Sequence, residues 1–320
     1  MSSLRARPYA SGDRQAWDEL VEASWNGTFL HTRRYLSCVE EGIVDASLVI
    51  EDAKGHLVGV LPAGIHASDA TMIESHPAVA YGGIVHRGEL VGERMRTALE
   101  VVADRYYHDG WRTLRYKAVP QIYHRVPAAD DLYALFCAQA VRSRCDVASV
   151  VDLCDRRPLS PRRTRSRRKA ERAGVEVTRD PEHLDALWSV LAQRLAEKFN
   201  TEPLHDAAAL AAVQRSFPER IECVAGLLDG SVVAGVVVFR TGRVDHAQYI
   251  AADDRGYRMA ALDAILSACL DGSERRGARY FSLGNSTVYG GRVFNESLFS
   301  YKSGFGAGVV VHECYDLRLA

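Results

Sequence analysis

The chain has 320 residues, of which 47% are hydrophobic and 25% are charged, and its formal net charge is −1. These values are typical of a globular protein and exclude a globally basic nucleic-acid binder, although a local basic patch stays compatible with them. The length exceeds that of one compact core of ordinary size, so two domains are expected.

Cysteine usage and apolar runs indicate the compartment. The seven cysteines are widely scattered and include no Cys-x-x-Cys pair. This pattern fits buried thiols in a reducing compartment and predicts neither a disulfide framework nor a metal centre. No apolar run approaches the length of a membrane span, and the first residues lack the apolar core of a signal peptide. We therefore expect a cytoplasmic protein.

The first half of the chain predicts a series of short elements, assigned from apolar periodicity and turn residues. In order these are a helix over 11–24, a second helix after 27–35, strands over 46–51 and 57–65 joined by a turn at 52–55, a strand over 75–85 interrupted by two glycines, a helix over 91–107, a strand over 112–117, a helix over 130–143 and a strand over 146–153.

The second half repeats this order. Strands over 221–228 and 232–240 form a hairpin at Asp229-Gly230, and a strand over 244–252, a helix over 258–274 and a strand over 278–283 follow. Because hairpin, strand, helix, glycine and strand occur twice in the same order, the sequence predicts two similar α/β domains. We place them at residues 1–153 and 176–320, with a basic connecting helix at 154–175.

The connecting segment over 159–174 is the most basic part of the chain. Ser160 suits a helix cap, Pro161 the first helical position and Gly174 the stop. Residues 162–172 contain seven basic side chains against the single Glu171. Several arginines fall in the first turns, where the helix dipole opposes positive charge. This arrangement indicates a phosphate-rich partner. The alternative is a solvated linker helix whose arginines pair with acidic residues elsewhere.

The stretch over 279–306 carries the strongest signal for a site. A short strand ends at Leu283, and a polar loop with three glycines follows it. Such a loop, fixed at the end of a strand, is a common location for binding residues. It leads to Lys302, one of only five lysines among the forty basic residues, which is surrounded by aromatic residues and glycines. The alternative is a surface lysine that protects an edge strand.

Several other motifs are excluded. Gly284-Asn-Ser286-Thr-Val288 has valine where a nucleophile elbow needs glycine. Gly304-Phe-Gly306-Ala-Gly308 has no following helix and is therefore no dinucleotide fingerprint. A phosphate-binding Walker loop and a His-Glu-x-x-His zinc motif are both missing. Tyr249, Asp245 or His246 could act as a base toward an amine, although each residue type is also an ordinary structural choice.

Taken together, six motifs resemble one family. They are Phe29-Leu-His-Thr-Arg-Arg-Tyr-Leu, Tyr81-Gly82-Gly83, the close of the basic helix at Ala170-Glu-Arg-Ala-Gly-Val-Glu-Val, the helix after Arg255-Gly256-Tyr257, Ser282-Leu283-Gly284 and Tyr301-Lys302-x-x-Phe305-Gly306. The chain is similar to the FemABX peptidoglycan-bridge aminoacyltransferases and to the related BioF2-like acyltransferases of the acetyltransferase (GNAT) superfamily. The resemblance implies an α/β (α+β) protein with two tandem acetyltransferase-like domains, each a mixed sheet flanked by helices. It places the donor chiefly on the second domain.

The resemblance also implies an activity, which is amide-bond formation by transfer of an aminoacyl group from aminoacyl-tRNA to an amine. The acceptor would be a peptidoglycan precursor or a peptidyl natural product such as a peptidyl nucleoside, and no further cofactor is expected. Lys302 matches the lysine that the family's Phe-Lys-x-x-Phe-Gly pattern places at the reaction centre, with Tyr301 replacing the first aromatic. The chemistry agrees, because acyl transfer to an amine passes through an oxyanion that a fixed ammonium stabilises.

Two alternatives to this activity stay open. Coenzyme-A-dependent members of the superfamily carry a Gln/Arg-x-x-Gly-x-Gly/Ala loop whose backbone amides hold the pyrophosphate. Here the run is Arg255-Gly-Tyr-Arg258-Met-Ala260, and the side chain of Arg258 hinders close approach of a pyrophosphate. Either side chains hold the phosphates, or coenzyme A is not the donor. A different class is a non-catalytic double domain that binds RNA or a nucleotide through the basic helix.

The predicted site residues fall into three groups, and no metal ligand is among them. They are Lys302, Asn285 and Tyr249 for catalysis; Tyr81, Ser286, Tyr289, Asn295 and Tyr301 for substrate binding; and Arg162, Arg163, Arg165, Arg168, Lys169, Arg255 and Arg258 for the donor or its tRNA.

Overall fold

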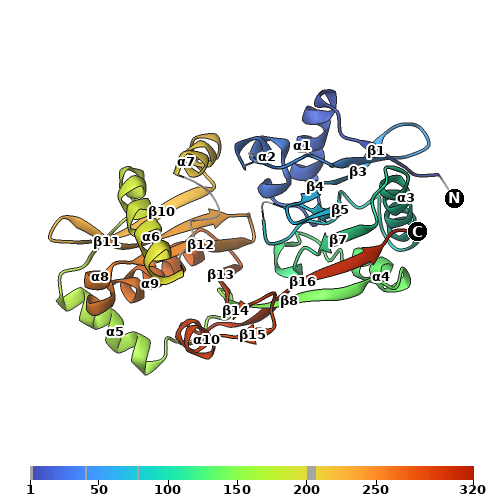
Figure 1. Ribbon diagram of the computed structural model, residues 1–320. Coiled ribbons are helices and arrows are strands. Elements are labelled where there is room, and N and C mark those ends of the chain that lie inside the picture. The colour runs from blue at the N-terminus through green and yellow to red at the C-terminus, as the bar shows by residue number, and fades with distance from the viewer. Residues whose placement is uncertain (1–2, 40–41, 78, 200–206) are drawn as a thin grey trace. The chain divides into compact units, whose positions relative to one another are not determined.

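The computed structural model describes residues 3–39, 42–77, 79–199 and 207–320, which form two compact units (Figure 1). Unit 1 consists of Met1–Val147, Val288–Val293 and Val311–Ala320, and unit 2 of Ala148–Thr287 and Phe294–Val310. The border after Val147 lies close to the predicted end of the first domain. Residues 288–293 and 311–320 differ from the prediction, because they belong to unit 1 although the sequence placed them in the second domain.

Unit 1 contains two sheets, with strand orders β1-β2-β3-β6 and β4-β5-β7-β16-β8. Its elements are β1 (Arg5–Pro8), α1 (Arg14–Ala23), α2 (Arg33–Val39), β2 (Leu48–Glu51), β3 (Leu57–Leu61), β4 (Ala63–His66), β5 (Asp69–Ser75), β6 (Val85–His86), α3 (Glu93–His108), β7 (Thr113–Lys117), α4 (Asp130–Cys137), the first part of β8 (Val141–Asp152) and most of β16 (Gly308–Arg318), with short 3-10 helices at Ser11–Asp13, Phe29–His31 and Gln121–Tyr123.

Three element predictions for unit 1 are wrong. The strand predicted over 75–85 is not found among the described residues of that range, because β5 ends at Ser75 and β6 begins only at Val85. The strand predicted over 57–65 is divided at Pro62, and its halves β3 and β4 enter different sheets. Proline has no N–H to donate to a ladder, which explains the break. The helix predicted over 130–143 ends at Cys137, and Val141 already begins β8.

Unit 2 is built on one sheet with the strand order β8-β13-β12-β11-β10-β9. Its elements are the end of β8, α5 (Pro161–Arg172), β9 (Glu176–Thr178), a 3-10 helix (Pro181–His183), α6 (Leu184–Phe199), α7 (Ala207–Ser216), β10 (Ile221–Leu228), β11 (Ser231–Arg240), β12 (Val244–Ala252), α8 (Asp254–Met259), α9 (Ala261–Arg275), β13 (Tyr280–Asn285) and α10 (Glu296–Ser303). The short strands β14 (Thr287–Val288) and β15 (Val293–Phe294) pair with each other.

Helices cover both faces of the unit 2 sheet, where α6 packs against β11 and β12 and α9 against β10, β11 and β12 (Figure 1). Small residues permit this close packing. A side chain at Gly235 would meet Leu187 of α6 at 2.6 Å, and one at Gly226 would meet Ile265 of α9 at 2.8 Å. Gly226 pairs with Ala234, the neighbour of Gly235. Because successive residues point to opposite faces, α6 and α9 lie on opposite sides of the sheet.

The element order that predicted two similar domains recurs in the structure. In unit 1, β5 is followed by α3 and by β7, and β7 pairs parallel to β5. In unit 2, β12 is followed by α8, α9 and β13, and β13 pairs parallel to β12. The predicted fold class, a mixed α/β protein with helices flanking large sheets, is confirmed. Among the described residues no helix is both long and apolar enough to cross a membrane.

Candidate active site

The parallel strands β12 and β13 separate at their carboxyl ends. Their ladder runs from Val244 opposite Tyr280 to His246 opposite Ser282, whereas β12 continues to Ala252 and β13 to Asn285. In α/β sheets, ligands commonly bind beyond the carboxyl ends of parallel strands. The chain turns at Gly284, whose φ of +74° is in the region that favours glycine.

Lys302 of α10 reaches this strand end. Its side chain is buried, with 6% of the residue exposed. The ammonium Nζ donates hydrogen bonds to the carbonyl oxygens of Gly284 at 3.0 Å and Asn285 at 2.6 Å. Of the three hydrogens that an ammonium carries, these bonds use two. The lysine also lies in the last turn of α10, where the helix dipole favours a cation.

Burial sets the protonation of Lys302. It lowers the pKa of this ammonium from 10.5 to about 8, because an ammonium removed from water loses hydration that two carbonyl dipoles replace only in part. At pH 7 the group is therefore still mostly a cation. Such a fixed positive charge in a buried setting suits the stabilisation of a developing oxyanion.

Two basic side chains lie near Gly284. A Cβ built on Gly284 would lie 3.7 Å from His246 Cε1, 4.0 Å from the Ala247 carbonyl oxygen and 4.0 Å from Lys302 Nζ. An imidazole and an ammonium therefore lie close to the same point at the strand end. In acyl transfer to an amine, an ammonium can stabilise the oxyanion and an imidazole can accept the proton of the amine.

The two residues that follow Gly284 contribute differently. Asn285 offers its backbone carbonyl to Lys302, so the contact shown is not made by the predicted amide side chain. Ser286 is buried, with 1% exposed, and its hydroxyl has no hydrogen-bond partner among the described residues. A buried hydroxyl without a partner costs free energy, which makes Ser286 a candidate contact for a bound molecule.

The other predicted loop residues have local structural positions. Asn295 caps α10, because its side chain accepts a hydrogen bond from the Leu298 amide at 3.1 Å. Tyr289 is 81% exposed and has a φ of +52°, and its predicted role in substrate binding stays a prediction. Tyr301 precedes Lys302 on α10 and packs edge-on against Phe305 with ring centroids 5.4 Å apart.

Tyr249 and Tyr81 lie in separate units. On β12, Tyr249 is half-buried and packs edge-on against Trp188 of α6 at 5.1 Å between ring centroids. Tyr81 is buried in unit 1, where its ring lies 4.5 Å from that of Tyr123. Their predicted roles in catalysis and substrate binding stay predictions.

The basic helix α5 begins as predicted, with the Ser160 hydroxyl accepting from the Arg163 amide at 3.3 Å. Most of its cations are exposed to solvent: Arg162, Arg165, Arg168, Lys169 and Arg172. Arg167 is half-buried, and Arg163 is buried, with 6% exposed and an ion pair to Asp263 of α9 at 2.8 Å. A buried, paired guanidinium has no access to an RNA phosphate, so the prediction that Arg163 binds the donor is corrected.

The segment aligned with the pyrophosphate loop is a short helix, α8. Asp253 caps it by accepting a hydrogen bond from the Gly256 amide at 2.6 Å. A side chain at Gly256 would meet the Val233 carbonyl oxygen at 2.3 Å, so this glycine is needed for packing against β11. Arg255 forms an ion pair with Asp229 at 2.7 Å, and Arg258 is exposed. The Asp253 carboxylate thus accepts the hydrogen bond of the Gly256 amide, which belongs to the segment that corresponds to the phosphate-binding loop of coenzyme-A enzymes.

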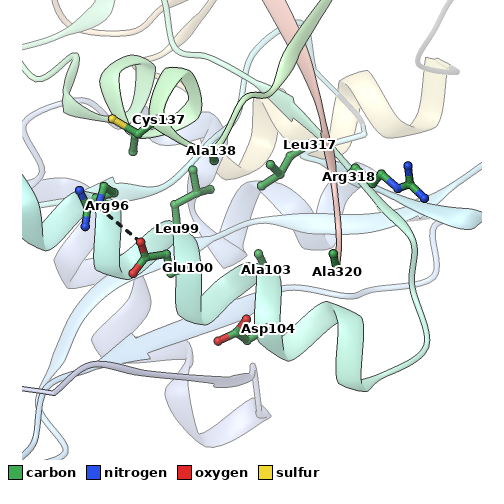
Figure 2. A pocket seen from close by; sticks show the side chains of 11 residues that line it. Arg96, Leu99, Glu100, Ala103, Asp104, Cys137, Ala138, Leu317, Arg318 and Ala320 are labelled. Carbon is green, nitrogen blue, oxygen red and sulfur yellow. Dashed lines mark ion pairs between the residues drawn. The ribbon is translucent and has the colours of Figure 1, made fainter.

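Unit 1 has a pocket of about 320 Å³ between α3, α4 and the end of β16 (Figure 2). Its rim carries the Arg96–Glu100 ion pair at 3.4 Å, and Leu99, Ala134 and Leu317 are among its apolar residues. None of the predicted site residues lines it. In the described part of the chain, no group of three or more His, Cys, Asp or Glu side chains is placed to hold a metal ion.

Comparisons with known proteins agree with this architecture. Residues 162–296 match the acetyltransferase (GNAT) domain family. The structure of FemX is similar at a TM-score of 0.67 with 11% identity, covering 97% of this chain and 96% of that one. The C-terminal domain of a protein from Agrobacterium fabrum, assigned as a lysylphosphatidylglycerol synthetase, gives 0.61 with 14% identity over 89% and 90%.

A tandem GNAT protein from the clavulanic acid biosynthesis pathway gives a TM-score of 0.55 with 12% identity, over 99% of both chains. No curated protein matches this sequence. At these identities the structural likenesses establish the fold. The chain thus has the fold of FemX and of the tandem GNAT protein, which confirms the fold that its sequence motifs predicted.

Proposed function

We propose that this protein is an N-acyltransferase that moves an aminoacyl group from aminoacyl-tRNA to an amine and forms an amide bond. The observation that carries the proposal is the buried Lys302 ammonium, held on the carbonyls of Gly284 and Asn285 where β12 and β13 separate. The acceptor classes that fit are a peptidoglycan precursor and a peptidyl natural product.

The reaction consists of three events that the site has to assist. An amine attacks the ester carbonyl of the donor, the carbonyl oxygen becomes an oxyanion, and the amine loses a proton as the amide forms. Lys302 supplies positive charge beside that oxygen. We assign the acceptance of the proton to His246, whose ring atom Cε1 lies 3.7 Å from the Cβ position of Gly284. The ribose hydroxyl of the tRNA then leaves with a proton.

Two features favour aminoacyl-tRNA over coenzyme A as the donor. The Gly256 amide is already bonded to the Asp253 carboxylate, whose negative charge disfavours a pyrophosphate at this position. Helix α5 presents Arg162, Arg165, Arg168, Lys169 and Arg172 to solvent. A row of exposed cations matches a line of phosphates better than the few phosphates of one small cofactor.

The decisive experiment supplies each donor separately. The purified protein is incubated with labelled aminoacyl-tRNA and a panel of amine acceptors, namely glycine, lysine and short peptides, and amide formation is followed by mass spectrometry. Transfer is expected, and ribonuclease treatment of the donor should abolish it. Turnover of acetyl-coenzyme A without RNA would instead establish the coenzyme-A-dependent N-acyltransferase. RNA binding without transfer of either acyl group would indicate a non-catalytic double domain.

Charge reversal on α5 should weaken tRNA use selectively. In a variant with Arg165→Glu, Arg168→Glu and Lys169→Glu, the slope of log affinity for tRNA against log salt should fall by about two or more, because phosphate contacts release counterions. The rate with a minimal aminoacyl-nucleotide should stay close to wild type. A matched variant reverses three exposed unit 1 arginines, Arg5, Arg14 and Arg34. An equal loss in both variants would argue against a specific role for α5.

A further inference from the structure

Arg163 differs from every other cation of α5 in its surroundings. Its guanidinium donates a hydrogen bond of 2.8 Å to Asp263, and both side chains are almost fully buried, with 7% and 6% exposed. The guanidinium carbon also lies 4.5 Å from the centroid of the Tyr301 ring and 6.0 Å from that of Phe305. A flat guanidinium can stack on a ring and pair with a carboxylate at once, which an ammonium does less well.

These rings flank Lys302 in the sequence, with Tyr301 on α10 and Phe305 just beyond the end of that helix. Tyr301 precedes the lysine, and Phe305 follows one turn after Tyr301, so the contact with Arg163 grips α10 beside its functional residue. The backbone adds to this contact, because the Ser160 amide donates to the Gly304 carbonyl at 2.8 Å. The start of α5 and the end of α10 are therefore joined by a hydrogen bond and a stacked cation, and the Arg163–Asp263 ion pair ties α5 to α9 at the same place.

The packing at this joint leaves no space for adjustment. A side chain at Gly304 would lie 2.9 Å from Arg163 Cγ and 3.0 Å from Ser160 Oγ. One at Gly306, whose φ is +87°, would lie 2.6 Å from the Arg157 carbonyl oxygen. Since close-packed interiors transmit small displacements, a change at Arg163 should move α10. The hydrogen bonds from Lys302 to Gly284 and Asn285 measure 3.0 and 2.6 Å, so a shift of about 1 Å would break them.

We infer that Arg163 is a positioning residue for Lys302: stacked on Tyr301 and paired with Asp263, it holds α10 so that the ammonium stays on the carbonyls of Gly284 and Asn285. The inference rests on the proposed function, because it assigns Arg163 to the placement of the proposed oxyanion-stabilising group. It also explains a buried arginine in a helix whose other cations are mostly exposed.

The test measures the state of Lys302 without any substrate. Because the chain has only five lysines, protein labelled with 13C at the lysine ε-carbon gives few NMR signals, and the Lys302 signal is identified by its loss in Lys302→Arg. Burial lowers the pKa of Lys302 to about 8 in the wild type. In Arg163→Met, α10 should loosen and water should reach the ammonium. The midpoint of the Lys302 titration should then rise toward 10.5, by about one pH unit or more.

A double variant guards against a loss of folding, and two single variants serve as comparisons. Arg163→Met alone leaves the Asp263 carboxylate buried and unpaired, which can unfold the protein. The double variant Arg163→Met with Asp263→Leu removes both charges together and should fold, yet it should show the same raised midpoint, because the stacking on Tyr301 is gone. Arg163→Lys keeps the charge and should give a smaller shift. Arg165→Met, at an exposed position of α5, is the matched control and should leave the midpoint unchanged.

Activity provides an independent readout. In the double variant kcat should fall roughly 10- to 100-fold through misplacement of Lys302, with KM for the donor unchanged. An unchanged Lys302 midpoint in a folded double variant would overturn the inference, whatever the fate of the proposed function. Conversely, a raised midpoint in a protein with no transferase activity would support the positioning role and refute the function, so the two failures are distinguishable.

Discussion

Replacing Lys302 with alanine is expected to lower kcat by about 10²–10³-fold, the usual effect of losing one oxyanion-stabilising donor. The fold should persist, because the substitution removes a buried charge that, among the described residues, is hydrogen-bonded to two carbonyls. The pKa of Lys302 is lowered to about 8, so the ammonium is present below pH 8 and is lost above it. The wild-type kcat should therefore decline as the pH rises through about 8, in a profile measured with saturating donor.

Lys302→Arg separates charge from geometry. Arginine stays protonated throughout this range, so the decline above pH 8 should disappear. Its planar fork does not reproduce a compact ammonium between the Gly284 and Asn285 carbonyls, so kcat should be only partly restored. Lys54→Ala, at an exposed position of unit 1, is the control. Wild-type turnover in Lys302→Ala would show that the lysine has a purely structural role.

Unit 1 is expected to lose stability steeply in mild acid, because four of its histidines are buried as neutral rings. Burial is the main cause that lowers the pKa of His31, His86 and His312 from 6.5 to about 4, and it also lowers the pKa of His76 well below 6.5. The unfolded chain takes up these protons near pH 6.5, whereas the folded unit does not. The unfolding free energy of unit 1 is therefore not reduced by these histidines above pH 6.5, and it falls as the pH decreases toward 4.

The expected slope is large. Each such histidine costs up to ~1.4 kcal/mol of unfolding free energy per pH unit in this window. Asp131 offsets the effect of one histidine. Burial raises the pKa of its carboxyl to about 6, so the folded unit binds this proton before the unfolded chain does, which stabilises the fold at low pH. The unfolding free energy should still fall by several kcal/mol between pH 6.5 and 5, because the unfolded chain binds on the order of three more protons than the folded one in this range.

Hydrogen exchange of peptides from residues 28–36 and 308–318 would report this loss in unit 1. His312 provides the sharpest variant, since neither of its ring nitrogens has a hydrogen-bond partner among the described residues. His312→Phe should lower the slope of unfolding free energy against pH by an amount that corresponds to about one proton. A matched change at His108, which is exposed at the end of α3, should leave it unaltered. If His312→Phe kept the wild-type slope, the ring would have to be protonated in the folded unit.

The sequence predicted best those elements whose local signals agree with their tertiary role. The hairpin at Asp229-Gly230 is an example, because both residues have positive φ, of +53° and +74°, as that turn requires. Failures occur where a long-range partner decides the structure. No element was predicted over 184–216, where α6 and α7 lie, nor over 308–318, where β16 pairs with β7. Pairing between residues about 200 positions apart produces no signal in a local sequence window.

The candidate site was predicted in part. Lys302 was singled out from its composition and motif, and its burial beside Gly284 agrees with a functional role. The helix that carries it was not predicted, although Asn295 before Glu296 is an N-cap signal followed by an acidic first-turn residue. Arg163 was grouped with its exposed neighbours. Its spacing of seven from the buried Ala170 places both on one helix face, which was the available signal for its burial.

The strand β16 has a consequence for the order of events during synthesis. Leu114 of β7 lies opposite Leu317, and Lys117 opposite Cys314, so the sheet of unit 1 is completed only by residues at the far end of the given sequence. While a ribosome makes unit 2, the nascent unit 1 lacks this strand, and one edge of β7 is an open template for other chains. Vectorial folding, in which an N-terminal domain matures first, is therefore expected to leave unit 1 without β16 until residues 308–318 have been made. A chaperone that shields strand edges should matter more for this protein than for tandem domains joined end to end.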